Sequence, residues 1–210
     1  MSLVLAADYR VPDFDHWWAA LTGDLPRLPS LGAHHIVVYR SLQDASRIFV
    51  TIGVRERGPV DALLRSPVMF SWFDAAGVEE IPPMFAGEVV EKLELAGDAA
   101  APAVPGAVIV AAIAPVGRLE GFEGLDRLRA SVHAAVARLA ASGVRRFWIY
   151  RALDDQAEVM ILLQIATERQ AEQWIRHPDA AAAFMAEAGA GAYPPLFVGR
   201  LVQAIEVPGD

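Results

Sequence analysis

Cysteine is absent from all 210 residues of this sequence. Disulfide bonds, thiolate catalysis and cysteine-bound metals are therefore excluded. Basic residues are also few, because 18 lysines and arginines stand against 26 aspartates and glutamates, and the net charge is -8. A nucleic-acid-binding face is usually basic, so we expect neither a nucleic-acid partner nor binding to an anionic membrane. A chain without cysteine is typical of the cytoplasm, which is the location that we predict.

Charged residues are missing from one long segment, 99–117, which approaches the length of a membrane span. Prolines and a glycine interrupt this segment, so we do not expect a membrane helix. We predict instead an Ala/Pro linker at 96–105, followed by a buried strand at 107–113. Residues 1–10 carry no basic region ahead of their apolar run, and we expect no signal peptide there.

Several motifs that hold cofactors or metals are also missing. The sequence contains no phosphate-binding loop, no G-x-G-x-x-G, no G-x-S-x-G and no H-E-x-x-H. Carboxylates are numerous, but none pair at a spacing that indicates acid–base catalysis. We therefore predict no bound cofactor and no metal.

What the chain does contain is an internal repeat. Segment 32–54 aligns with segment 143–165, and the strings GAHHIVVYRSLQD and GVRRFWIYRALDD show the match. After one inserted residue the alignment continues to the end of each copy. A register kept over such a length indicates a duplication. We predict a first repeat at 1–95, a linker at 96–105 and a second repeat at 106–210.

Each copy has the same predicted order of elements. A strand opens it, a helix follows, two strands joined by a tight turn come next, and a helix broken by a proline precedes the last strand. Asp13 is placed to cap the first helix, and Gly143 to end its counterpart. Pro67 and Pro178 mark the two breaks, after which Asp179 is placed to cap a helical piece at 180–188. The predicted strands are 3–8, 34–40, 47–54, 84–95, 107–113, 145–151, 158–165 and 196–207.

This order, β-α-β-β-α-β twice over, is the ferredoxin-like split arrangement. Its sheet has helices on one face only, so the other face needs a cover. Two copies in one chain supply that cover for each other. We therefore predict an α+β fold in which two ferredoxin-like repeats pack sheet on sheet as an intrachain α+β barrel.

The sequence at this point resembles the dimeric α+β barrel superfamily in tandem form. The likeness rests on the element order, on the strand-turn-strand with Tyr-Arg, and on His177-Pro178 with Phe184 after it. A His-Pro or Ser-Pro at this place is similar to the antibiotic-biosynthesis-monooxygenase and stress-responsive barrel families. The superfamily includes cofactor-free monooxygenases, haem-degrading enzymes, chlorite-dismutase-like haem proteins, isomerases and proteins with no known activity. The resemblance therefore implies the fold and leaves the function open.

Strand alternation sorts the side chains into two faces. The purely aliphatic faces should pack on the helices, and the mixed faces with aromatic and polar members should face the barrel interior. A concave apolar wall with a few polar groups is typical of small-molecule sites. The alternative is that the same side chains simply fill a packed interface. The residues predicted to line the interior are His35, Tyr39, Phe49, Thr51, Arg146, Trp148, Tyr150, Met160 and Gln164.

Positions that differ between the copies are the better candidates for chemistry, and these are His35 against Arg146 and Thr51 against Leu162. Tyr-Arg recurs in both copies, which favours a structural role such as an Arg near a strand end pairing with Asp44 or Asp155. The adjacent His34 and His35 should point to opposite faces of their strand, so they should not bind one metal together.

Two functions compete. The first is cofactor-independent monooxygenase or isomerase chemistry on a small apolar or aromatic molecule, with His35 as the base. Arg146, Tyr39 and Tyr150 would then orient the substrate or stabilise an oxyanion. The second is a non-catalytic barrel that binds such a ligand. A third, haem binding, would need an axial ligand from His35, His133 or His177. We expect a small-molecule ligand, and either a monomeric pseudo-dimer or a homodimer.

Overall fold

The computed structural model describes residues 3–64, 66–95, 106–116, 123–177, 183, 186–187 and 196–207. The elements follow the predicted order. The first copy contains β1 (Leu3–Arg10), α1 (Phe14–Asp24), η1 (Leu25–Arg27), η2 (Pro29–Leu31), β2 (Ala33–Ser41), β3 (Arg47–Val54), α2 (Arg57–Leu64), α3 (Pro67–Ala75) and β4 (Met84–Glu94). The second contains β5 (Val108–Pro115), α4 (Glu123–Ala134), α5 (Val136–Ala141), β6 (Val144–Ala152), β7 (Glu158–Ile165), α6 (Glu168–Arg176) and β8 (Phe197–Glu206). We refer to these sets as repeat 1 and repeat 2.

The local signals in the sequence explain where the helices begin and end. The Asp13 side chain caps α1 by accepting the backbone N–H groups of residues 15 and 16, each at 3.0 Å. Gly143 has a φ of 93°, which suits glycine, where the helix of repeat 2 ends. That helix is interrupted at Ala135, so it forms α4 and α5 rather than one helix. The predicted linker, Pro178, Asp179, Phe184 and the helical piece at 180–188 lie outside the continuous described stretches.

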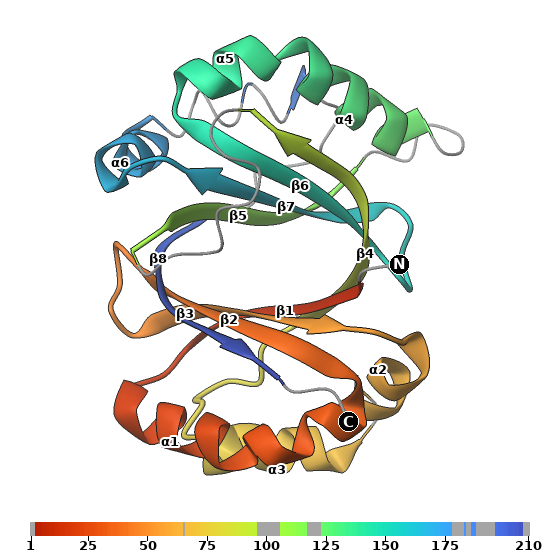
Figure 1. Cartoon of the computed structure of the whole chain (residues 1–210), viewed down its shortest axis with the longest axis vertical. Coiled ribbons are helices and arrows are strands. Elements are labelled where there is room, and N and C mark those ends of the chain that lie inside the picture. The colour runs from red at the N-terminus through yellow and green to blue at the C-terminus, as the bar shows by residue number, and fades with distance from the viewer. Residues whose placement is uncertain are drawn as a thin grey trace.

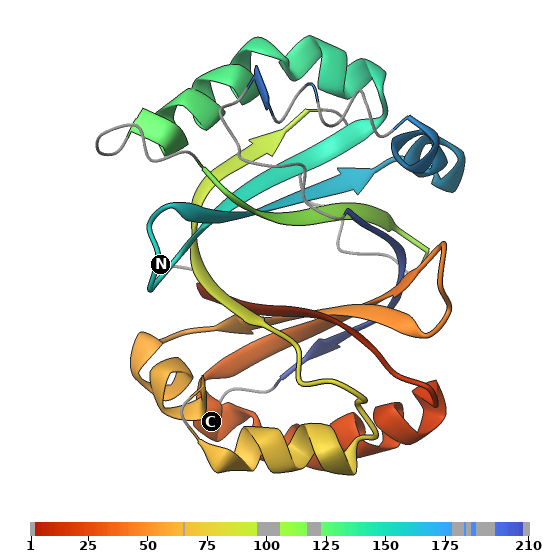
Figure 2. The same ribbon diagram turned by 180° about the vertical axis from the view of Figure 1, so that it is seen from behind.

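The strands form one closed antiparallel barrel in the order β1-β3-β2-β8-β5-β7-β6-β4. The last strand of each repeat carries the pairing into the other repeat, because β4 pairs with β1 and β6, and β8 pairs with β5 and β2. The helices of repeat 1 cover one outer side of the barrel and those of repeat 2 cover the opposite side, as Figures 1 and 2 show. The predicted α+β fold and intrachain barrel are confirmed.

The barrel has an approximate twofold axis along its length. A shift of four places around the ring superimposes each strand of one repeat on its counterpart in the other. The strands follow one another in the same direction around the ring in both repeats. The registers agree, since Leu3 pairs with Val54 as Val108 pairs with Ile165. Equivalent residues therefore lie at the same end of the barrel. We refer to the end where β3 begins as the Arg47 mouth and to the other end as the His35 mouth.

The strand faces separate the core into an interior part and two helix-side parts. Ile36 and Val38 pack under the helices of repeat 1, and Phe147 and Ile149 pack under those of repeat 2, as the alternation predicted. A separate buried cluster occupies the barrel interior. Its larger members are Tyr39, Phe49, Phe85, Met160, Leu162, Phe197 and Leu201.

In the described part of the chain, every helix is too short or too polar to cross a membrane.

Candidate functional site

Side chains fill the middle of the barrel, including most of those predicted to line a cavity. The rings of Phe49 and Phe197 lie 5.3 Å apart, and those of Tyr39 and Phe49 lie 6.3 Å apart. Burial raises the pKa of Tyr150 to about 12, so its hydroxyl stays protonated. The predicted interior residues that belong to this cluster or pack against it are Tyr39, Phe49, Trp148, Tyr150 and Met160, and Thr51 is also buried.

The two residues predicted to be catalytic lie on opposite walls of the His35 mouth. His35 is paired with Gly53 of β3, and Arg146 occupies the equivalent place in repeat 2, paired with Gln164 of β7. The Arg146 side chain is largely buried, and its Nε lies 3.9 Å from a carboxylate oxygen of Glu94. The structure therefore brings His35, Arg146 and Gln164 to one end of the barrel. Their catalytic and binding roles stay predictions.

The prediction that His34 and His35 point to opposite faces is wrong. The pairing of β2 with β3 shifts its register between Ala33 and His35, and such an irregularity breaks the simple alternation of a strand. The two imidazole rings lie 4.4 Å apart, and their Nδ1 atoms share a hydrogen bond of 2.8 Å. Burial lowers the pKa of both, and Arg55 further lowers that of His34. In this hydrogen bond one Nδ1 atom donates and the other must accept. Neutral rings allow this, because a protonated imidazole has no accepting nitrogen.

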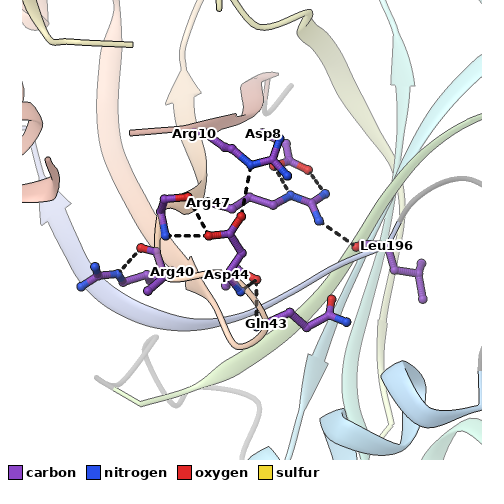
Figure 3. Close-up of polar contacts among 10 residues, drawn as sticks. Asp8, Arg10, Arg40, Gln43, Asp44, Arg47 and Leu196 are labelled. Atoms are coloured by element: carbon purple, nitrogen blue, oxygen red, sulfur yellow. Dashed lines mark hydrogen bonds and ion pairs between the residues drawn. The ribbon is translucent and has the colours of Figure 1, made fainter. Parts of the chain in front are cut away.

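Among the described residues, Arg40 of the first recurring Tyr-Arg does not make the ion pair with Asp44 that we expected. Arg40 donates instead to a backbone carbonyl of the following turn at 2.6 Å, and Asp44 pairs with Arg10 at 3.1 Å (Figure 3). In repeat 2 the guanidinium of Arg151 pairs with Glu88 of β4. The arginines still have structural roles, with different partners.

A pocket of about 260 Å³ opens at the Arg47 mouth, next to the filled interior, and we refer to it as the mouth pocket. Beside it, the Arg47 guanidinium pairs with the Asp8 carboxylate through two nitrogens and donates to the Leu196 carbonyl at 3.4 Å (Figure 3). The residues that line the mouth pocket are Asp8, Phe49, Pro83, Met84, Phe85, Ala111, Ala112, Ile113, Glu158 and Phe197.

A second pocket, of about 160 Å³, lies between the sheet and the helices of repeat 1. We refer to it as the helix pocket. Aromatic and aliphatic side chains form its walls, and Asp24 and Arg27 are the charged residues among the described ones that line it. Its lining residues are Leu5, Ala6, Ala7, Tyr9, Trp17, Leu21, Asp24, Arg27, Leu28, Val50, Ile52, Leu63, Met69, Trp72, Phe73 and Met84.

One buried hydrogen bond supplies a polar group to the helix pocket. The indole Nε1 of Trp17 donates to the hydroxyl of Tyr9 at 3.1 Å, and both side chains are almost fully buried. Burial raises the pKa of Tyr9 well above its usual value, so the phenol keeps its proton. Among the described residues, nothing accepts that proton. A ligand with an acceptor atom could therefore use it.

Sequence reasoning placed the ligand in the barrel interior and therefore missed the helix pocket. The available signal was the concentration of aromatic residues in repeat 1, where Phe14, Trp17, Trp18, Trp72 and Phe73 fall on α1 and α3. Their rings contact one another, and Tyr9 of β1 meets both Trp17 and Phe73 edge to face.

Repeat 2 has a larger cavity, of about 590 Å³, beside α5 and α6. His177, which follows α6 and is exposed, is among its lining residues. The other described residues around it are Arg138, Leu139, Ala141, Ser142, Gln170, Gln173, Trp174, Ala183 and Glu187. Within the described ranges, no three histidine or carboxylate side chains cluster closely enough to hold a metal ion.

Comparison with known proteins supports the fold. No protein-family model and no curated protein matches the sequence. The crystal structure of an anthrone oxidase-like protein is similar, with a TM-score of 0.71 and 13% identity over 98% of this chain and 93% of that one. A heme-binding protein from Thermus thermophilus gives a TM-score of 0.55 and 18% identity, covering 97% of this chain and 93% of that one.

A third similar structure is a ferredoxin fold protein related to antibiotic biosynthesis monooxygenases, from Listeria monocytogenes. Its TM-score is 0.53 at 8% identity, covering 97% of this chain and 96% of that one. Identities this low show the fold alone. The chain has the tandem form of the dimeric α+β barrel fold, as its sequence resemblance predicted.

Proposed function

We propose that this protein binds a small, mainly apolar molecule, about the size of one aromatic ring, in the helix pocket of repeat 1. The observation that carries the proposal is the pocket itself, which joins apolar walls to a single buried hydroxyl. Small-molecule sites commonly have this composition, with a few polar groups that fix the ligand's orientation.

The volume sets the size of the ligand. An engineered apolar cavity of about 150 Å³ stays dry and binds benzene. The helix pocket has about 160 Å³ and similar walls, so a single substituted ring is the natural occupant. Water gains little there because it needs several polar partners.

The Tyr9 hydroxyl selects among such rings. Because it accepts from Trp17 and keeps its own proton, it can donate to a carbonyl or ether oxygen of the ligand. We therefore expect acetophenone, which has one acceptor oxygen, to bind more tightly than ethylbenzene, which has none. The predicted oxygenase or isomerase activity would place His35 and Arg146 near the substrate, and neither lines this pocket.

The experiment is a titration of isotope-labelled protein with both ligands, followed through the indole N–H signals of its five tryptophans. We expect the signals of Trp17 and Trp72 to shift, because these residues line the pocket. Trp148 packs in the barrel interior and serves as the matched control. Single Trp→Phe variants assign the signals.

Two variants test the location of the ligand. Ala7→Leu fills the pocket from β1, and Leu28→Trp closes it from the η1 side. Leu28 is less buried than Ala7, so the second variant should fold even if the first is destabilised. Both should abolish the Trp72 shift. Binding that survives in a folded variant, or the absence of any ligand-induced shift in the wild type, would contradict the proposal.

Haem binding in repeat 2 is the second candidate, and one observation favours it. Of the three histidines predicted as axial ligands, His177 is the one that lines the large cavity of repeat 2. That cavity also offers Trp174 and Leu139 as apolar surface and Arg138 as a cation for a propionate. Haem would supply redox chemistry at that place. A haem titration tests it, because a Soret shift lost in His177→Ala would support this candidate and an unshifted band would remove it.

A further inference from the structure

We propose that the mouth pocket is a separate ligand site, which takes a small organic cation with an apolar body, such as an arylalkyl amine. This inference does not depend on the helix pocket. It rests on a reversal of charge between the two repeats at the same end of the barrel.

The charge reversal concerns the first residue of β3 and of β7. Arg47 begins β3 and Glu158 begins β7, and the twofold axis makes their positions equivalent. The partner position also differs, because Asp8 of β1 corresponds to Ile113 of β5. Repeat 1 therefore has an ion pair where repeat 2 has a carboxylate beside an aliphatic side chain.

The hydrogen bonds of Arg47 go to groups other than Glu158. Its guanidinium donates to Asp8 through two nitrogens and to the Leu196 carbonyl through a third (Figure 3). The guanidinium also lies 5.4 Å from the ring centre of Phe197. The charge of Asp8 is thus balanced within its own pair.

The carboxylate of Glu158 has no cationic partner of this kind among the described residues. Among the described residues, no hydrogen bond or ion pair reaches its carboxylate, and its neighbours in the preceding turn are Asp154 and Asp155. Burial raises the pKa of Glu158, and the charges of these two acids raise it further, because both disfavour the ionised carboxylate. As far as the described residues go, the pocket therefore has an unpaired carboxylate on the repeat 2 side.

The walls beneath Glu158 suit the apolar body of a cation. Phe49, Phe85 and Phe197 line the pocket with Ile113, and aromatic faces attract cations in addition to burying apolar area. A volume of about 260 Å³ admits a single ring with a short amine. The ammonium group would meet the carboxylate at the mouth while the ring lies against the phenylalanines.

The test measures the binding of benzylamine and benzyl alcohol to the full chain by calorimetry. The two probes have the same shape, but only the amine is charged near pH 7. We expect benzylamine to bind, and Glu158→Gln to weaken it by about tenfold, because a charge-assisted hydrogen bond is lost. Benzyl alcohol should bind more weakly, with no difference between wild type and variant.

Asp154→Asn is the matched control, since it removes the same charge from a residue that does not line the pocket. Its effect should stay within about threefold, as for a solvent-screened charge. Glu158→Gln should fold at least as stably as the wild type, because it removes a carboxylate from among like charges. Leu28→Trp in the helix pocket should leave benzylamine binding unchanged.

Three results would overturn the site. The first is that benzylamine does not bind the wild type, and the second is that Glu158→Gln binds it equally well. The third is that Asp154→Asn weakens binding as much as Glu158→Gln does, which would indicate a general electrostatic attraction rather than a contact with Glu158. Benzylamine binding that disappears in a folded Leu28→Trp variant would place the ligand in the helix pocket instead.

Discussion

At the scale of single residues, the difference between the two repeats is clearest at Tyr9. Its equivalent in β5 is Ala114, which has no hydroxyl to accept a hydrogen bond such as the one from Trp17. A buried phenol and indole are stable in repeat 1 because each supplies the other with a partner. The same pair leaves one hydroxyl proton for a ligand.

We predict that Tyr9→Phe lowers the free energy of unfolding by about 1–3 kcal/mol, because the buried indole N–H of Trp17 loses its acceptor. Urea unfolding measures this change. Tyr39→Phe is the control, since Tyr39 is equally buried and its hydroxyl makes no hydrogen bond among the described residues. Equal losses for the two variants would contradict the role given to the Tyr9–Trp17 bond.

Alternation placed the apolar faces of β2 and β6 correctly against the helices. It assigned Ile36 and Val38 to the helix side, and it failed at His34, next to a register shift. A shift of this kind depends on how a neighbouring strand pairs, so the pattern of one strand does not reveal it. The ring contact between His34 and His35 could therefore not be read from their spacing.

At the scale of elements, the strands that join the repeats need glycine at one position each. Gly87 of β4 and Gly199 of β8 are equivalent, and a Cβ at either would lie 2.8 Å from a backbone oxygen of the partner strand, Arg151 O and Arg40 O respectively. It would also meet the ring of the phenylalanine two residues earlier on the same strand. A phenylalanine of the barrel interior thus covers each glycine, where β4 and β8 pass to the other repeat.

We expect Gly87→Ala and Gly199→Ala to destabilise the protein by similar amounts, about 1–3 kcal/mol each, because backbone as well as side-chain atoms must move. Gly58→Ala on α2 is the control, since nothing among the described residues lies within 4 Å of the added carbon. Chemical denaturation compares the three variants. A Gly87→Ala protein as stable as the wild type would contradict this account, because β4 and β6 could then move apart without a loss in the free energy of unfolding.

The order of the elements could be predicted from the sequence because the repeat supplies each signal twice. Proline and glycine positions set most helix ends, and Asp13 caps α1 as its sequence position indicates. The break at Ala135 was not predicted, since no proline or glycine marks it. The helix pocket was also missed, because its walls come from separate elements whose distance apart only the packed structure fixes.

At the scale of the whole molecule, the two repeats share one barrel. Because β4 and β8 are each paired with strands of both repeats, neither copy has a complete set of neighbours by itself. The repeat boundaries at 1–95 and 106–210 remain a prediction from the sequence. In the ring, the four strands of each repeat lie next to one another, and the two sets are joined by the pairing of β4 with β6 and of β8 with β2.

We therefore predict one cooperative unfolding transition for the chain, with the calorimetric enthalpy equal to the van't Hoff enthalpy. Differential scanning calorimetry measures both. Two resolved transitions would mean that the repeats unfold independently, against the pairing of β4 with β6 and of β8 with β2.

The most direct test of the proposed function is the position of a heavy-atom ligand in crystals soaked with bromobenzene. We expect the anomalous bromine signal between β1, α1 and α3, next to Trp17 and Trp72. Bromine located only among the phenylalanines of the barrel, or no ordered bromine in the helix pocket, would contradict the account.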